Sequence, residues 1–190
     1  MVARLAILVL LTATSVAMGS ALGLGLNQLN VMVSGEYFEI VVGAGLGPMS
    51  TRDVALLHGV IEGGVAGAAF GILLAVLAAG TGWGHLRFAA LMRPLLAGYL
   101  GAVTCILLFG AGGLVLGSLD PVAYEGMFPA ARGASNIAAF GWVGGSIWGG
   151  YAGAVVGFMT AAIVWVRQLL NSAWLKPGFD VLPSRHKSEL

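Results

Sequence analysis

Charged side chains are scarce in this sequence, and their scarcity limits what the protein can be. They make up 9% of its 190 residues, whereas soluble domains carry about 25%. Hydrophobic residues make up 58%, and the mean hydropathy is +0.94. The formal net charge is only +1, which gives no indication of a nucleic-acid partner. The composition therefore predicts a protein whose main surroundings are a lipid bilayer.

The sequence also lacks the patterns of a disulfide framework, a hydrolase or a closed metal site. Its single cysteine, Cys105, lies in an apolar run and cannot form an intrachain disulfide, so we interpret it as a small hydrophobic residue in a helix interface. No serine, histidine and acid suggest a catalytic triad, and no HExxH zinc motif occurs. We therefore predict that the protein is not an enzyme, and the sequence identifies no cofactor.

What the sequence does contain is long apolar stretches, and about 20 apolar residues suffice for a helix to cross a bilayer. We predict an all-α membrane protein with four transmembrane helices, at about 4–27, 53–79, 94–117 and 135–166. These spans form one domain, residues 1–170, and residues 171–190 form a cytoplasmic tail. A signal peptide is the alternative for the first stretch, but the apolar run continues to Leu26, which favours a retained span.

The segments between the spans are predicted from their polar and turn-forming residues. A polar connection is expected from about Asn30 to Arg52. His85–Met92 is expected to lie in the membrane interface, and Pro94 in the first turn of the third span.

Two stretches carry a glycine at every fourth residue, the pattern of a glycine zipper. The eight glycines, called the ladder glycines below, are Gly59, Gly63, Gly67 and Gly71 in the second span, and Gly145, Gly149, Gly153 and Gly157 in the fourth. A shift of 86 residues superposes the two sets, which predicts an internal repeat of two parallel two-helix halves. Such glycines let another backbone approach closely, so we expect the second and fourth spans to meet through them. In the first span, Ala13, Ala17, Ala21 and Gly25 form a further ridge suited to close packing.

Basic residues predict the orientation of the chain. Seven lie at one end of the spans and two at the other; they are Arg4, Arg87, Arg93, Arg167, Lys176, Arg185 and Lys187 against Arg52 and Arg132. The positive-inside rule then puts both termini in the cytoplasm.

Glu62 is the only acidic residue well inside a predicted span, and His58 lies four residues earlier on the same helical face. An ionisable side chain in the bilayer costs at least about 2.5 kcal/mol, so it needs a partner or a path to water. Three interpretations are open. Glu62 could relay protons or ions with His58 modulating it, the pair could help to bind a metal or pigment, or Glu62 could form a structural clasp. Trp148, which occupies the equivalent position in the fourth span, is a candidate partner for a clasp, the interpretation that we favour.

A second pair of acids, Glu39 and Glu125, lies in the two connections at equivalent positions of the proposed repeat. They could bind a cation or a partner protein. They could equally be solvated loop charges, which need no further explanation.

Residues 139–153, AFGWVGGSIWGGYAG, and residues 58–63, HGVIEG, resemble a group of uncharacterised small four-helix membrane proteins of bacteria. The resemblance implies the four-helix architecture and a bacterial inner-membrane location, and it brings no activity. We predict a non-catalytic structural or accessory subunit of a larger membrane complex, with other membrane subunits or further copies of itself as partners. The alternative is a small transporter or channel that uses Glu62 and His58. The two differ in that a transport site needs Glu62 beside a cavity or water, whereas a clasp leaves it dry and paired.

Overall fold

The computed structural model describes residues 2–82, 84 and 86–174, and over these residues the chain is helical with no strand. The four long helices are α1 (Val2–Ile40), α2 (Thr51–Gly82), α3 (Phe88–Leu119) and α5 (Ile137–Trp174), and the short elements are η1 (Ala44–Leu46), α4 (Pro121–Met127) and η3 (Pro129–Gly133). Each long helix is long and apolar enough to cross a membrane. The predicted all-α class with four such helices is confirmed.

Several predicted boundaries are wrong, because polar residues in this protein are not confined to loops. The connection expected from Asn30 begins only after Ile40, and α1 continues through Asn30, which is fully buried. A kink interrupts α1 at Ser34 (φ −153°, ψ 95°). At the start of α3, Phe88 is already helical and Pro94 is a buried residue inside the helix. Beyond residue 170, α5 continues to Trp174, and the rest of the predicted tail lies outside the described residues.

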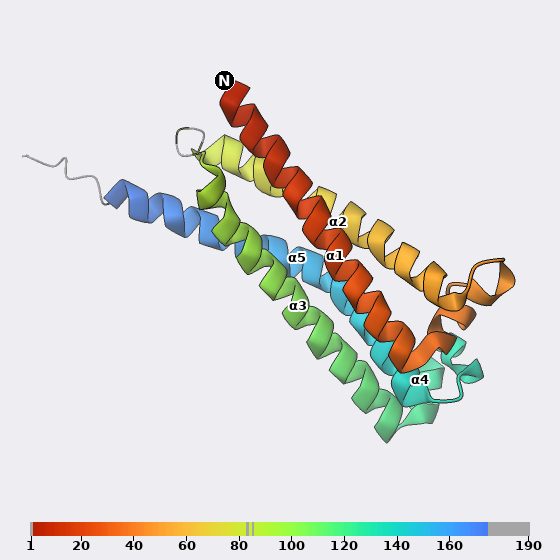
Figure 1. Ribbon diagram of the computed structural model, residues 1–190. Helices are drawn as coiled ribbons and strands as arrows, with labels where there is room; N and C mark the ends of the chain where they lie inside the picture. Colours follow the sequence, from red (N-terminus) through yellow and green to blue (C-terminus); the bar gives the residue numbers. More distant parts are fainter. Residues whose placement is uncertain (1, 83, 85, 175–190) are drawn as a thin grey trace, which may run out of the picture.

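The helices form two hairpins, α1 with α2 and α3 with α5, which lie beside each other (Figure 1). The most extensive contacts are those within each hairpin. Segments that follow one another along a chain usually pack together, and here the short connection of residues 41–50 joins α1 to α2 directly.

The ladder glycines lie in the contacts within each hairpin. A methyl group added to Gly63 would overlap the carbonyl oxygen of Gly19 in α1, and one added to Gly145 would overlap the carbonyl oxygen of Phe109 in α3. The prediction that the second and fourth spans meet through their ladders is therefore wrong. Close approach needs small residues on both helices, and each ladder finds them on the preceding helix.

The face of α1 that meets α2 also differs from the predicted ridge. Ser15, Gly19 and Gly23 supply it, whereas a methyl group on Gly25 would meet no atom within 4 Å. The sequence contains two small-residue series on this helix, offset by two positions, and only the packing distinguishes them.

The two hairpins contact each other mainly through two buried clusters. The terminal cluster, near the chain ends, includes Leu11, Leu74, Leu91, Leu95 and Trp165. The loop cluster, near the connections, includes Tyr37, Phe38, Tyr124, Phe140 and Val143. Hydrogen bonds accompany both clusters. Trp165 Nε1 donates to Thr81 Oγ1 at 2.9 Å, and Ser146 Oγ donates to Asn30 Oδ1 at 3.1 Å.

Candidate functional site

A cavity of about 140 Å³ lies between the hairpins, and all four long helices line it. Glycines of α1, α2, α3 and α5 form much of its wall, because they have no side chains to fill the space. Its polar lining consists of four side chains, Asn27, Glu62, Tyr99 and Tyr151. A second hollow of about 490 Å³ lies between α1 and α2 near the chain ends, but Thr12 is the only polar residue among the described residues that line it. The central cavity is therefore the candidate site.

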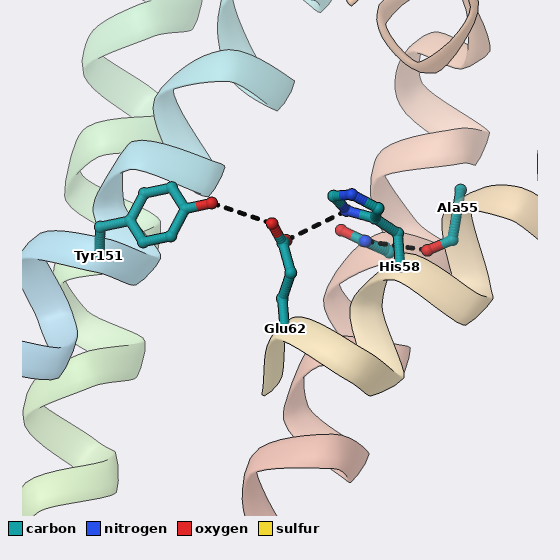
Figure 2. A network of polar contacts seen from close by, with 5 residues as sticks. Ala55, His58, Glu62 and Tyr151 are labelled. Carbon is teal, nitrogen blue, oxygen red and sulfur yellow. Dashed lines mark hydrogen bonds and ion pairs between the residues drawn. The ribbon is translucent and has the colours of Figure 1, made fainter. Parts of the chain in front are cut away.

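Glu62 connects the two hairpins at one side of this cavity. Its Oε1 accepts a hydrogen bond of 2.9 Å from the Tyr151 hydroxyl of α5, and its Oε2 lies 3.2 Å from Nδ1 of His58 on α2 (Figure 2). The His58 and Glu62 side chains are 44% and 39% exposed. The hydrogen bond between Tyr151 and Glu62 is also exposed. The carboxylate thus has partners on both sides, yet it is neither buried nor isolated from the cavity.

Trp148 does not take the position expected for the clasp. It is 59% exposed and packs edge-on against Tyr151, with ring centroids 5.9 Å apart. Tyr151, three residues further along α5, supplies the hydrogen bond to Glu62 instead. The assignment of Trp148 to helix packing and to the clasp came from the repeat alignment, which assumed that the ladders of α2 and α5 face each other.

Two polar side chains of the cavity wall, the buried Asn27 and the half-buried Tyr99, were missed by the sequence analysis. Asn27, which is 4% exposed, donates from Nδ2 to the carbonyl oxygen of Ala55 at 2.9 Å. Tyr99 donates to the carbonyl oxygen of Ser15 and lies 3.2 Å from its hydroxyl. A lone polar side chain in an apolar helix was the signal available for both, since such groups normally face the protein interior.

The outer acids have separate local roles in the described structure. Glu39 is exposed and accepts a hydrogen bond of 2.9 Å from Thr51 Oγ1, across the connection between α1 and α2. Glu125 lies in α4, half-buried. Near the connections, a neighbouring acid of α1, Glu36, reaches the segment before α5, because its carboxylate accepts from the backbone N–H of Ser135 at 2.8 Å. Beside Glu125, burial raises the pKa of the Tyr124 phenol.

Within the described residues, no group of three His, Cys, Asp or Glu side chains is placed to hold a metal ion. Cys105 is a free, half-buried thiol on α3, and its carbonyl oxygen lies against the backbone of Gly149.

Comparison with protein-family models, with curated proteins and with solved structures finds no match to this chain.

Proposed function

We propose that the protein is a small membrane transporter and that its substrate site is the central cavity beside Glu62. The observation that carries this proposal is the position of a carboxylate at the wall of a cavity lined by both hairpins. Ionisable residues within membrane helices usually face a cavity or a bundle interior, where they mark substrate or ion pathways. A purely structural clasp requires no cavity next to the paired carboxylate.

The arrangement of the hairpins suggests how such a site could open to either side. Backbone contacts through glycines hold each hairpin together, whereas side chains of the terminal and loop clusters join one hairpin to the other. Tightly packed units tend to move as rigid bodies. Rocking of the hairpins would separate one cluster while the other stays closed, which is the principle of alternating access.

For the location we propose a bacterial inner membrane with both termini in the cytoplasm. The support is the distribution of basic residues, since Arg4, Arg93 and Arg167 belong to the end of the bundle with the termini, and Arg52 and Arg132 to the other end. In this orientation the loop cluster lies at the outer end of the bundle.

An accessory role in a larger complex is the second candidate, and one observation favours it. Trp148 and Tyr151 are 59% and 54% exposed beside the half-exposed His58 and Glu62. Polar groups at this depth are more stable against protein than against lipid, so a helix of another subunit could cover this face.

Flux into liposomes tests the transport proposal. We expect the reconstituted full chain to carry protons or small cations, and Glu62→Gln to reduce this flux at least about tenfold, because the amide keeps the shape of the side chain but not its charge. Gln can still accept from Tyr151, so the variant should stay folded. Flux equal in wild type and variant would contradict the proposal. Absence of flux together with a stoichiometric partner subunit after mild purification would support the accessory role.

A further inference from the structure

We infer that the cavity binds small monovalent organic cations, in which an ammonium group carries a short apolar body. As a statement about transport this rests on the proposed function, whereas as a statement about binding it stands on the cavity alone.

The charge of the ligand follows from the cavity wall. Among the described residues that line the cavity, Glu62 is the only one with a charged side chain, and no Lys, Arg or His is among them. His58 contacts Glu62 but does not line the cavity. A negatively charged ligand would find no cationic partner and would meet a carboxylate, so the site favours a cation.

The chemical nature of the cation follows from the small number of oxygen atoms in the wall. A bare inorganic cation gives up its water shell only where several oxygen ligands replace it. Here the Tyr151 hydroxyl already donates to Glu62, and the Asn27 amide N–H already donates to the carbonyl oxygen of Ala55. The rest of the wall consists largely of glycine and apolar residues. An ammonium group needs only a few acceptors, and its apolar body suits the rest of the wall.

Aromatic rings give the site further affinity for an organic cation. Phe70, Tyr99 and Tyr151 line the cavity, and the rings of Phe70 and Tyr99 pack edge to face with centroids 5.5 Å apart. Cations are attracted to the faces of such rings. Apolar groups attached to the ammonium also gain from contact with them.

The volume limits the size of the part of the ligand that lies inside the cavity. At about 140 Å³, the cavity is close to the engineered apolar cavity of roughly 150 Å³ that accommodates benzene. A ligand of up to about six non-hydrogen atoms therefore fits.

Binding to the purified full chain in nanodiscs of zwitterionic lipid tests the ligand class. The probes are propylammonium, propanol and propionate, which share a short aliphatic body and differ in charge. We expect saturable binding of propylammonium by calorimetry, binding of propanol at least about tenfold weaker, and no detectable binding of propionate. Equal binding of propanol or propionate would overturn the inference.

Variants then locate the bound cation. Glu62→Gln should weaken propylammonium binding at least about tenfold. A methyl group at Gly150, which lines the cavity, would meet no atom within 4 Å, so Gly150→Ala and Gly150→Leu should weaken binding progressively as the space is filled. Gly112→Leu is the matched control, because Gly112 is an exposed helical glycine that also has no atom near its added methyl and lies outside the cavity.

Unchanged affinity in a folded Gly150→Leu protein would overturn the cavity as the site. Should Gly150→Leu fail to fold, unchanged affinity in Gly150→Ala and Glu62→Gln would do the same. Flux measurements in liposomes distinguish a failure of the transport proposal from a failure of the proposed ligand class. Binding of propylammonium without any flux would overturn transport and leave the ligand class intact. Proton flux that depends on Glu62, without binding of propylammonium, would overturn the ligand class and leave transport intact.

Discussion

The hydroxyl of Tyr151 is the contact through which the second hairpin reaches Glu62. It donates to Oε1 from α5, while His58 approaches Oε2 from the helix that carries Glu62 itself. The two contacts therefore have different consequences. The contact with His58 shapes one helix, whereas the contact with Tyr151 connects the hairpins at the side of the cavity (Figure 2).

Removing this hydroxyl should loosen the connection without disturbing the fold. We expect Tyr151→Phe to lower the free energy of unfolding by about 0.6 kcal/mol and by at most about 1.7 kcal/mol, the average and the maximum measured for side-chain hydrogen bonds between helices of a membrane protein. The ring keeps its packing against Trp148. Thermal unfolding in detergent measures the change, and Trp148→Phe is the control, since Trp148 is exposed and the hydrogen bond to Glu62 comes from Tyr151. A larger loss in Trp148→Phe than in Tyr151→Phe would contradict this account.

For single residues, the sequence predicted the candidate site residues better than it predicted the residues that they contact. Glu62 and His58 were recognisable because charge and helical spacing are local properties. Tyr151 was not, because its role depends on which faces of α2 and α5 meet. Asn27 lay at the end of a predicted span, where a polar residue suggests a boundary, although it is buried in the middle of a longer helix.

Each hairpin is built around backbone contacts that glycines make possible. The crossing of α3 with α5 at Gly113 and Gly141 is reciprocal, because a methyl group on either residue would overlap the carbonyl oxygen of the other. A backbone atom cannot move aside as the end of a flexible side chain can. The helices would have to separate to admit even a methyl group.

Two neighbouring glycines of α3 allow a matched test. Gly113→Ala should destabilise the protein by roughly 1–3 kcal/mol, the usual cost of overpacking. Gly112→Ala adds the same methyl group on an exposed face with no atom within 4 Å. Because alanine favours the helix over glycine by up to about 1 kcal/mol, Gly112→Ala should leave stability unchanged or raise it slightly. The measurement is thermal unfolding in detergent, and equal midpoints for the two variants would count against tight packing at this crossing.

The sequence predicted that the ladder glycines mark close helix contacts but assigned the wrong neighbour. Spacing shows that one face of a helix is free of side chains, and it carries no information about which other helix approaches that face. The neighbour is set by chain connectivity and by small residues on the facing helix, such as Gly19 and Gly113. The facing residues include types other than glycine, such as Ser15 and Ala102, and gave a weaker signal.

At the scale of the whole molecule, the two hairpins together line a space that neither contains alone. The number and class of the long helices could be predicted, because runs of apolar residues determine both. The cavity could not, since it depends on the separation of the hairpins between the terminal and loop clusters. Because of that separation, Glu62 and residues of α1, α3 and α5 line the same cavity.

Cross-linking the hairpins tests whether transport requires their relative movement. The side chains of Asn30 and Ser146 meet at 3.1 Å between α1 and α5, so Asn30→Cys with Ser146→Cys, in a Cys105→Ala background, should form a bridge between hairpins on oxidation. We expect this bridge to reduce flux at least about tenfold, because rocking requires the loop cluster to separate, and a reductant should restore it. Flux that continues unchanged through the oxidised protein would rule out such movement.

A bridge inside one hairpin provides the control for this experiment. A Cβ atom added at Gly64 of α2 would lie 2.8 Å from Oγ of Ser20 in α1, so Ser20→Cys with Gly64→Cys should link two helices that are already held together by Gly19, Gly23 and their partners. This bridge should leave flux unchanged, since no relative movement of α1 and α2 is needed when each hairpin moves as one body. Equal inhibition by both bridges would instead show that the helices move individually, and the glycine contacts would then be sliding surfaces rather than fixed ones.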